Sequence, residues 1–160
     1  HAFYRALPEE DRLSLKEDVR LNSWAERFIA KVSDGSLVSL VAKVDGEIVG
    51  EGSLYRTFHG WTRHVGEVRV SVAPAYRRHG LGRRLTLGLL KIAKDLGIEK
   101  VLLRIVETQQ PARQIALHLG FQQEAVLQRH VVDLAGHKHD LRILSLEMDQ
   151  LGPVTEMLSK

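Results

Sequence analysis

The sequence predicts an α/β (α+β) domain built on a mixed, mostly antiparallel sheet that is flanked by helices. Three observations carry this prediction: a two-residue turn joins two apolar segments, a strand–helix–strand unit follows them, and a pair of strands closes the chain. Two-residue turns make antiparallel neighbours, whereas a strand–helix–strand unit in one sheet is parallel and right-handed. We therefore expect one central parallel pair of strands in an otherwise antiparallel sheet.

Composition and length narrow the class of protein. A chain of 160 residues favours one domain, here residues 1–160, and 44% hydrophobic with 27% charged residues is ordinary globular usage. No apolar run approaches the roughly 20 residues of a membrane span, and no secretion signal opens the chain. Cysteine is absent, which excludes disulfides and thiolate chemistry. We therefore expect a soluble, cytoplasmic protein without a membrane partner.

The first elements are two helices within residues 7–32. Pro8 and the acidic residues that follow it suit a first helical turn, where proline and carboxylates are both favourable. The apolar spacing predicts that the second helix buries a stripe formed by Trp24, Phe28, Ile29 and Val32.

A hairpin follows these helices. Residues 37–44 and 47–54 have the short apolar pattern of strands, and Asp45-Gly46 between them is typical of a type I′ turn. A looser loop over residues 56–63 then leads to a third strand, residues 65–72, which Pro74 ends.

The second half of the chain alternates helices and strands. The long helix is expected to bury one face, formed by Leu85, Leu89, Ile92, Ala93 and Leu96. The predicted elements are a helix over 81–96, a strand over 101–106, a helix over 111–119, and closing strands over 125–132 and 139–148.

The segment that carries chemistry joins the third strand to the long helix, and reads Arg77-Arg78-His79-Gly80-Leu81-Gly82. A helix begins there, so unpaired backbone N–H groups gather at its positive end. Glycines at 80 and 82 remove the Cβ atoms that would keep a phosphate away from these N–H groups. Further positive charge comes from Arg77, Arg78, Arg83 and Arg84. This loop predicts a phosphate or pyrophosphate ligand.

The glycine spacing distinguishes between phosphate-binding families. A dinucleotide fingerprint would need a glycine where Leu85 stands, and a P-loop would need Gly-Lys-Ser/Thr. The hexapeptide instead matches the pattern R/Q-x-x-G-x-G/A of the GNAT superfamily of N-acetyltransferases. The chain also resembles this family in the strand ending Val72-Ala73-Pro74 and in the later segment Leu119-Gly120-Phe121. The resemblance covers residues 37–148.

This resemblance implies acetyl-CoA as the co-substrate and a splayed central parallel pair of strands that admits its pantetheine arm. The pyrophosphate would lie on the loop formed by Arg78, His79, Gly80, Leu81, Gly82 and Arg83. The pantetheine arm would run beside the backbone of Val70, Ser71 and Val72. Gln109 stands where many relatives have an asparagine, and it would reach the pantetheine amides.

The implied reaction is the direct attack of a primary amine on the acetyl thioester. It needs a base for the incoming ammonium, which we assign to Glu67; the alternative is a surface glutamate paired with Arg63 or Arg69. Ala116 replaces the tyrosine that many relatives use as a general acid. The leaving thiolate must then be protonated by water, Tyr55 or Tyr76, or needs no general acid.

The sequence leaves one alternative function open and disfavours two others. Gln109 and Ala116 differ from the asparagine and tyrosine of many relatives, which leaves open a catalytically degenerate domain that binds coenzyme A as a regulator. Nucleic-acid binding is disfavoured because the net charge is only +3 and the basic loop lacks interleaved aromatics. His137-Lys138-His139 offers two imidazoles without metal-site spacing, so we expect a solvated turn and no metal.

Several points stay open at this stage. Asp140 could bind an acceptor amine or cap a turn, and the loop with His59, Trp61, Arg63 and His64 could line the acceptor site or be an ordinary exposed loop. The acceptor is a polyamine, an amino acid, an antibiotic or a protein amine. Relatives often form homodimers, which makes a second copy a possible partner. The strand that usually opens this family has only residues 1–6 available, so it is very short or belongs to a longer protein.

Overall fold

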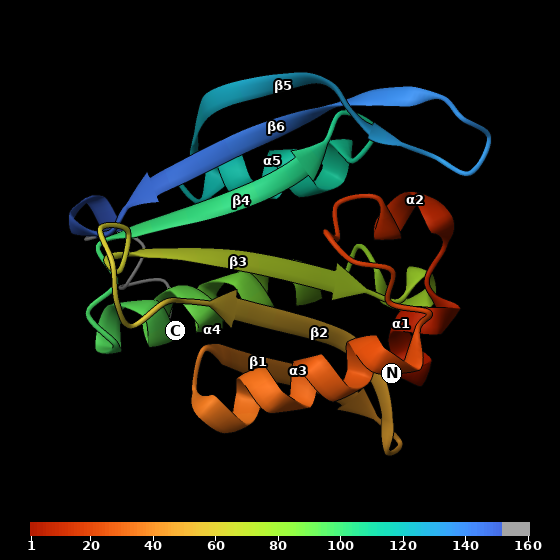
Figure 1. Cartoon of the computed structure of the whole chain (residues 1–160), viewed down its shortest axis with the longest axis horizontal. Coiled ribbons are helices and arrows are strands. Elements are labelled where there is room, and N and C mark those ends of the chain that lie inside the picture. Colours follow the sequence, from red (N-terminus) through yellow and green to blue (C-terminus); the bar gives the residue numbers. More distant parts are fainter. Residues whose placement is uncertain (152–160) are drawn as a thin grey trace.

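The computed structural model describes residues 1–151, so the last part of the predicted domain, residues 152–160, lies outside the described residues. Its sheet has six strands in the order β1-β2-β3-β4-β6-β5, with helices on both faces (Figure 1). The strands are β1 (Leu37–Val44), β2 (Glu47–Tyr55), β3 (Val65–Val72), β4 (Lys100–Val106), β5 (Gln122–Val132) and β6 (Lys138–Glu147). The α-helices are α1 (Ala2–Ala6), α2 (Glu9–Arg12), α3 (Asn22–Asp34), α4 (Leu81–Asp95) and α5 (Gln110–His118).

The predicted hairpin is confirmed. Val44 pairs with Glu47 across a two-residue turn, and Asp45 and Gly46 both have positive φ, 50° and 83°. Positive φ at both central positions is what a type I′ turn requires, and it favours the Asp-Gly sequence found here. A register shift between Ala42 and Lys43, which the apolar pattern does not signal, leaves Val49 as an extra residue and so places a bulge in β2.

The parallel pair and its separation are also confirmed. β3 and β4 pair from Val65 with Lys100 to Val68 with Leu103, and their pairing then stops. Beyond that point β3 still pairs with β2, and β4 still pairs with β6 as far as Val106. Figure 1 shows the two ribbons moving apart towards the carboxyl ends of both strands. The sheet therefore opens between two strands that stay anchored on their outer sides.

The main core lies between the sheet and the pair α4 and α5. Fully buried leucines of this cluster include Leu54 on β2, Leu89 and Leu90 on α4, and Leu144 on β6. Burying each such side chain contributes about 1.5–3 kcal/mol. α4 approaches β2 so closely that a Cβ at Gly52 would lie 2.9 Å from Cδ1 of Leu89. Leu96, expected on the buried face, is 38% exposed because α4 ends one residue before it.

The opposite face carries α1, α2 and α3 over a smaller cluster. Tyr4, Leu7, Val19 and Trp24 are its buried members, and Phe28 packs against them. The stripe predicted on α3 is therefore only half right, because Ile29 and Val32 are 64% and 44% exposed. α3 contacts the sheet through its Trp24 side, and the other two side chains lie beyond that contact.

The first residues differ from the strand that we considered for them. Residues 2–6 form the helix α1, and the sheet of the described residues begins at β1, whose outer edge is unpaired. Tyr4 explains this placement, because its ring packs edge-on against Trp24 at 4.9 Å between centroids. No helix within residues 1–151 has the length and apolar character to cross a membrane.

Candidate functional site

The loop between β3 and α4 has a backbone conformation that suits an anion. A short 3-10 turn, Pro74–Tyr76, leads into it, and both Arg78 (φ 65°) and Gly80 (φ 77°) are left-handed. Gly80 is also the N-cap of α4. Alternation of left-handed and ordinary residues turns successive N–H groups inward, which makes a concave anion-binding nest.

The first turn of α4 adds donors to this nest. The first helical hydrogen bond runs from the N–H of Arg84 to the carbonyl of Gly80 at 3.0 Å, so the amides of Leu81 and Gly82 precede it. A Cβ at Gly82 would meet Ile115 and Val72 at 3.7 and 3.8 Å, which is ordinary contact. Position 82 therefore tolerates a side chain in the fold, and the glycine keeps the space over the loop open.

Arg77 makes contacts within the chain that the sequence did not predict. Its Nε donates to the carbonyl of Val72 at 3.0 Å, and its Nη2 donates to Oδ2 of Asp11 at 2.5 Å. His79 Nδ1 lies 2.7 Å from the carbonyl of Arg77. The Arg77 guanidinium thus ties the loop to the end of β3 and to α2.

The edge of β3 leads from this loop into the opening of the sheet. Val70, Ser71 and Val72 pair with β2 on one side, whereas their pairing with β4 has ended. Their remaining backbone groups face the separation between the strands, as the predicted pantetheine site requires. On the other side of this opening, the Oε1 of Gln109 accepts a hydrogen bond from the N–H of Val106 at 3.0 Å. Gln109 therefore caps β4 and would offer a ligand its Nε2 amide.

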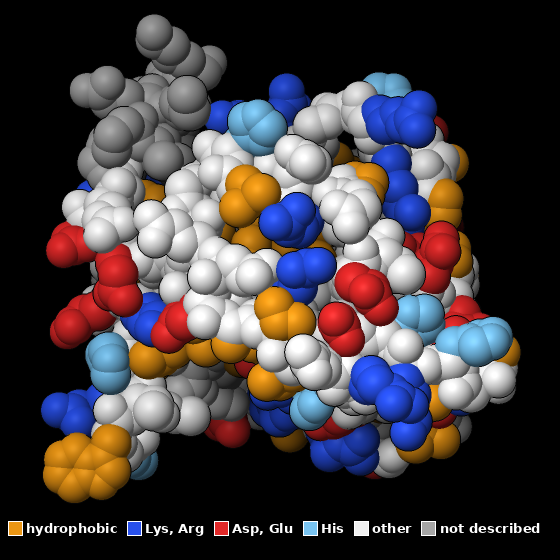
Figure 2. Space-filling view, turned by 90° about the horizontal axis from the view of Figure 1, so that it is seen from above, with side chains coloured by type: hydrophobic (Ala, Val, Ile, Leu, Met, Phe, Trp, Pro, Cys, Tyr) orange, Lys and Arg blue, Asp and Glu red, His pale blue; other side chains and the backbone are white. Residues whose placement is uncertain are grey.

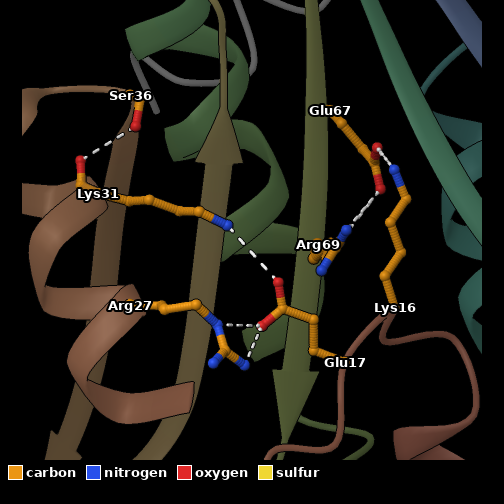
Figure 3. Close-up of polar contacts among 7 residues, drawn as sticks. All are labelled: Lys16, Glu17, Arg27, Lys31, Ser36, Glu67 and Arg69. Carbon is orange, nitrogen blue, oxygen red and sulfur yellow. Dashed lines mark hydrogen bonds and ion pairs between the residues drawn. The ribbon is translucent and has the colours of Figure 1, made fainter. Parts of the chain in front are cut away.

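Glu67 lies on β3 just before the strands part, and its side chain points away from the main core. Its Oε1 accepts from Nε and Nη2 of Arg69, both at 3.1 Å, and its Oε2 lies 3.2 Å from Nζ of Lys16 (Figure 3). Nε of Arg104, on the facing strand, lies 4.0 Å from Oε1. The Glu67 side chain is 17% exposed. Three cations thus surround one accessible carboxylate.

A cavity of about 160 Å³ opens beside this carboxylate. Its floor is β2 and β3, and its walls are α3 and the segment after α2. Glu17 binds two of the lining cations, with Arg27 Nη2 at 3.0 Å and Lys31 Nζ at 3.7 Å (Figure 3). The hydrogen bond from Arg27 lowers the pKa of Glu17. The lining residues are Lys16, Glu17, Trp24, Arg27, Phe28, Lys31, Tyr55, Glu67 and Arg69.

A buried polar network underneath the cavity was not expected from the sequence. Glu51 on β2 is 4% exposed and accepts from Ser39 and Ser53, both at 2.6 Å, and from the hydroxyl of Tyr4. Burial raises the pKa of Glu51, and these hydrogen bonds oppose the rise. Burial also raises the pKa of Tyr4. Side chains alternate between the two faces of β2, and because Gly50 and Gly52 face α4, Glu51 points to the other face. This alternation was the signal in the sequence that could have located Glu51.

Comparison with known proteins decides the family. Residues 2–121 match the family model described as Acetyltransferase (GNAT) family. The chain belongs to this acetyltransferase (GNAT) family. It is 31% identical over 113 residues to the L-amino acid N-acyltransferase MnaT of Escherichia coli (strain K12), a match that covers 69% of this chain and 64% of the relative's length. The recognition made from the glycine loop is thereby confirmed.

Solved structures show the same GNAT fold. The yncA structure from Salmonella typhimurium, determined with its cofactor acetyl-CoA, has 26% identity and a TM-score of 0.69 over 79% of this chain and 73% of that one. A GNAT acetyltransferase from Streptococcus pneumoniae has 24% identity and a TM-score of 0.72 over 86% and 88%. An N-acetyltransferase from Staphylococcus aureus Mu50 has 16% identity and a TM-score of 0.76 over 92% and 89%.

Two of the remaining segments singled out in the sequence make structural contacts, and a third is an exposed loop away from the site. Asp140 accepts a hydrogen bond from the N–H of Arg129 at 2.8 Å and so holds a bulge of β5. His139 Nε2 lies 2.9 Å from Asp133, whose pKa this contact lowers to about 2. The loop with Trp61, which is 93% exposed, joins β2 to β3 at the end of the sheet away from the glycine loop, and it lines neither the cavity above nor the sheet opening.

The surface charge is mixed on the face that Figure 2 presents. Lys and Arg side chains alternate there with Asp and Glu, and hydrophobic side chains are scattered among them (Figure 2). A nucleic-acid interface usually presents a continuous basic footprint instead. No continuous basic surface of this kind is visible on the face that Figure 2 presents.

Proposed function

We propose that this chain is an N-acetyltransferase that transfers the acetyl group of acetyl-CoA to a primary amine by direct attack. One observation carries the proposal: the anion-binding loop, the opened edge of β3 and the Glu67 carboxylate follow one another along a single strand. A cofactor held at the loop and along this edge would bring its far end to Glu67. The cavity beside Glu67 would then receive the amine.

The residues of the loop fit acetyl-CoA. The backbone N–H groups from Arg78 to Arg83 would bind the pyrophosphate, since two left-handed residues and a helix start converge there. The backbone of Val70, Ser71 and Val72 would hold the pantetheine arm, with the Nε2 amide of Gln109 on the opposite side of the opening. Bound acetyl-CoA supplies the activated acetyl thioester. The acetyl-CoA in the yncA structure supports this proposal.

Glu67 would hold the acceptor and help to remove its proton. An amine with a pKa near 10 reaches the site mostly as an ammonium, which a carboxylate binds well. The contact between Lys16 Nζ and Glu67 Oε2 at 3.2 Å shows that a primary ammonium fits beside this carboxylate. A carboxylate is a weak base towards such an amine, so we place a water between them for the proton transfer. The relative named an L-amino acid N-acyltransferase supports an amine acceptor.

The donor for the leaving thiolate is a separate question. Ala116 is 1% exposed and packs in the main core. The position at which many relatives have a tyrosine therefore offers no hydroxyl group here. Tyr55 lines the cavity, and burial raises the pKa of its phenol, which keeps it protonated at neutral pH. Tyr76 stands in the turn before the glycine loop. We propose Tyr55, Tyr76 or water as the donor, and the variants Tyr55→Phe and Tyr76→Phe distinguish them by their kcat.

One pair of measurements tests the proposed function. Calorimetry measures acetyl-CoA binding, and a thiol-release assay measures turnover on a panel of primary amines. Binding together with turnover on at least one amine is the expected result. Binding without turnover on any amine would favour a regulatory domain, which Ala116 in the place of tyrosine keeps as the second candidate. Absence of binding would contradict both.

A further inference from the structure

Lys16 brings a primary amine of the chain itself to the carboxylate of Glu67. Its Nζ lies 3.2 Å from Oε2 of Glu67, although the two residues are 51 positions apart in the sequence (Figure 3). Glu67 directly precedes Val68, which forms the last pair with Leu103 before β3 and β4 separate. The amine of Lys16 therefore lies at the closed end of the opening, where the proposed function places the acetyl end of the cofactor.

The other lysines of the described chain are placed differently. Lys31 also lines the cavity, but its Nζ lies 3.7 Å from the carboxylate of Glu17. The remaining lysine ion pairs within residues 1–151 involve carboxylates other than Glu67. Within these residues, Lys16 is thus the one lysine whose amine is paired with Glu67.

The segment that carries Lys16 is held in place on both sides. Leu15 packs against the smaller apolar cluster, and Val19 is a buried member of that cluster. Glu17, the next residue, binds Arg27 of α3 at 3.0 Å. These contacts hold the backbone, whereas the Lys16 side chain is 51% exposed and can turn between Glu67 and solvent. The fold thus determines where the amine lies and still leaves it free to react.

The cavity beside Glu67 has room for the product of such a reaction. Lys16 lines this cavity, which has a volume of about 160 Å³. A cavity of about 150 Å³ holds benzene, which is larger than an acetyl group. An acetyl group on Lys16 therefore has space beside Glu67.

We infer that Lys16 is a site of self-acetylation: the chain transfers the acetyl group of acetyl-CoA to its own Nζ when no other acceptor is bound. This inference rests on the proposed function and adds a modification site to it. In the transfer, Nζ bonds to the acetyl carbon and the carbon–sulfur bond breaks. Of the two protons that the ammonium gives up, one leaves through Glu67 and water, and the other ends on the sulfur of coenzyme A.

Acetylation of Lys16 changes how Glu67 meets other acceptors. The amide of acetyl-lysine carries no charge, so it does not form an ion pair with the carboxylate. Loss of an exposed ion pair of this kind should lower KM for a free amine by up to about fivefold. The modification thus opens the carboxylate to the ammonium of another acceptor.

Mass spectrometry tests the inference on the intact chain. The protein is incubated with isotopically labelled acetyl-CoA and no amine, and peptide mapping follows the label on each lysine over time. We expect Lys16 to be labelled at least about tenfold faster than the exposed Lys91, because an amine held at the reacting group reacts faster than a free one. The rate constant should not depend on protein concentration, since the amine and the carboxylate belong to one chain.

Variants then locate the reaction. Glu67→Gln should reduce the labelling of Lys16 to the rate of Lys91, while unchanged acetyl-CoA affinity in calorimetry reports that the variant is folded. Lys16→Arg keeps the positive charge and should show no fall in KM after incubation with acetyl-CoA. Lys91→Arg, on α4 and away from the cavity, is the matched control and should behave like the unaltered chain.

The outcomes separate this inference from the proposed function. Labelling of Lys16 no faster than that of Lys91, or equally fast in Glu67→Gln, would overturn the inference, and turnover of a free amine by the same preparation would leave the proposed function standing. A KM that stays the same after acetylation would overturn the release of Glu67. Absence of acetyl-CoA binding would overturn both the inference and the proposed function.

Discussion

The guanidinium of Arg77 binds the carboxylate of Asp11 across 66 residues of sequence, at 2.5 Å between Nη2 and Oδ2. This contact joins α2, on the side of the molecule where we propose the acceptor site, to the glycine loop, which we propose holds the cofactor. The same guanidinium holds the last carbonyl of β3. The conformation of the loop therefore depends on a helix far from it in the chain.

Asp11→Asn tests this link. Loss of the ion pair should leave the loop less fixed, so that acetyl-CoA affinity falls by about threefold to tenfold while the free energy of unfolding changes by less than about 1 kcal/mol. Calorimetry and chemical denaturation measure the two quantities. The control is Asp18→Asn, which breaks an exposed pair with Arg20 at 2.7 Å that has no contact with the loop. Equal affinity in both variants would show that the loop does not need the link.

Gly82→Val tests the anion-binding loop itself. The fold has ordinary space for a Cβ at this position, and valine costs no more than glycine inside a helix. The branched side chain would cover the loop amides, so acetyl-CoA binding should be abolished while the unfolding midpoint stays close to that of the unaltered chain. Lys94→Val, a change of the same kind near the end of α4, should bind acetyl-CoA normally. Unchanged affinity of Gly82→Val would refute the assignment of the loop.

Glu67→Gln tests the proposed base. The amide keeps the shape of the side chain but cannot hold an ammonium or accept its proton, so kcat/KM at neutral pH should fall by about 10²-fold or more. Acetyl-CoA affinity should change little, because Glu67 precedes the residues proposed to hold the cofactor. Steady-state kinetics measure the first quantity and calorimetry the second. Glu124→Gln, which breaks the exposed pair with Lys100, is the control; a rate profile equal to the control would remove Glu67 from the mechanism.

Lys16→Met tests whether the lysine occupies the position of the acceptor ammonium. Lys16 is 51% exposed, and an exposed ion pair of this kind is worth about 0.2–1 kcal/mol. Its removal should lower KM for the acceptor by up to about fivefold, with kcat little changed, since the acceptor no longer displaces it. Lys91→Met serves as the control for the loss of an exposed lysine. A raised KM would instead mean that Lys16 helps to bind the acceptor.

Glu51→Gln tests the buried network through the pH dependence of stability. The pKa of Glu51 is raised in the folded chain above its ordinary value of 4.5. Just above pH 4.5, the carboxyl group is therefore still protonated in the folded chain but already ionised in the unfolded chain. Stability of the unaltered chain should therefore decrease as the pH rises through the interval between the unfolded and folded pKa values. The glutamine variant does not lose stability in this way. Its free energy of unfolding should therefore increase relative to that of the unaltered chain as the pH rises through this interval. Parallel stability curves would contradict the raised pKa.

The positions of strands and helices could be predicted where short-range signals act. Asp45-Gly46, Pro74 and Gly97 mark turns and ends through their own backbone preferences, and the element bounds between them agree with the structure to within a few residues. α1 could not be predicted in this way, because it is a five-residue helix held by the packing of Tyr4 on Trp24. The exposure of Ile29 and Val32 has the same cause, since only the tertiary contact decides which part of α3 is covered.

The candidate site, too, could be predicted only in part from the sequence. The glycine loop could be recognised because the anion binding that we propose for it depends on the backbone conformation, which local sequence determines. Of the partners of Glu67, Arg69 could be named because it lies two residues away on the same strand, whereas Lys16 and Arg104 could not, because they come from separate elements that meet β3 only in the folded chain. The contact of Arg77 with Asp11 could not be predicted for the same reason, because the two residues lie far apart in the sequence.

The two clusters of apolar side chains have an evolutionary consequence. The cofactor loop is rooted in the large cluster under α4, whereas the cavity walls rest on the small cluster around Trp24. Substitutions in the walls thus cost little of the stability that the large cluster provides. Drift or laboratory selection can therefore change the side chains of the cavity walls before it disturbs the glycine loop.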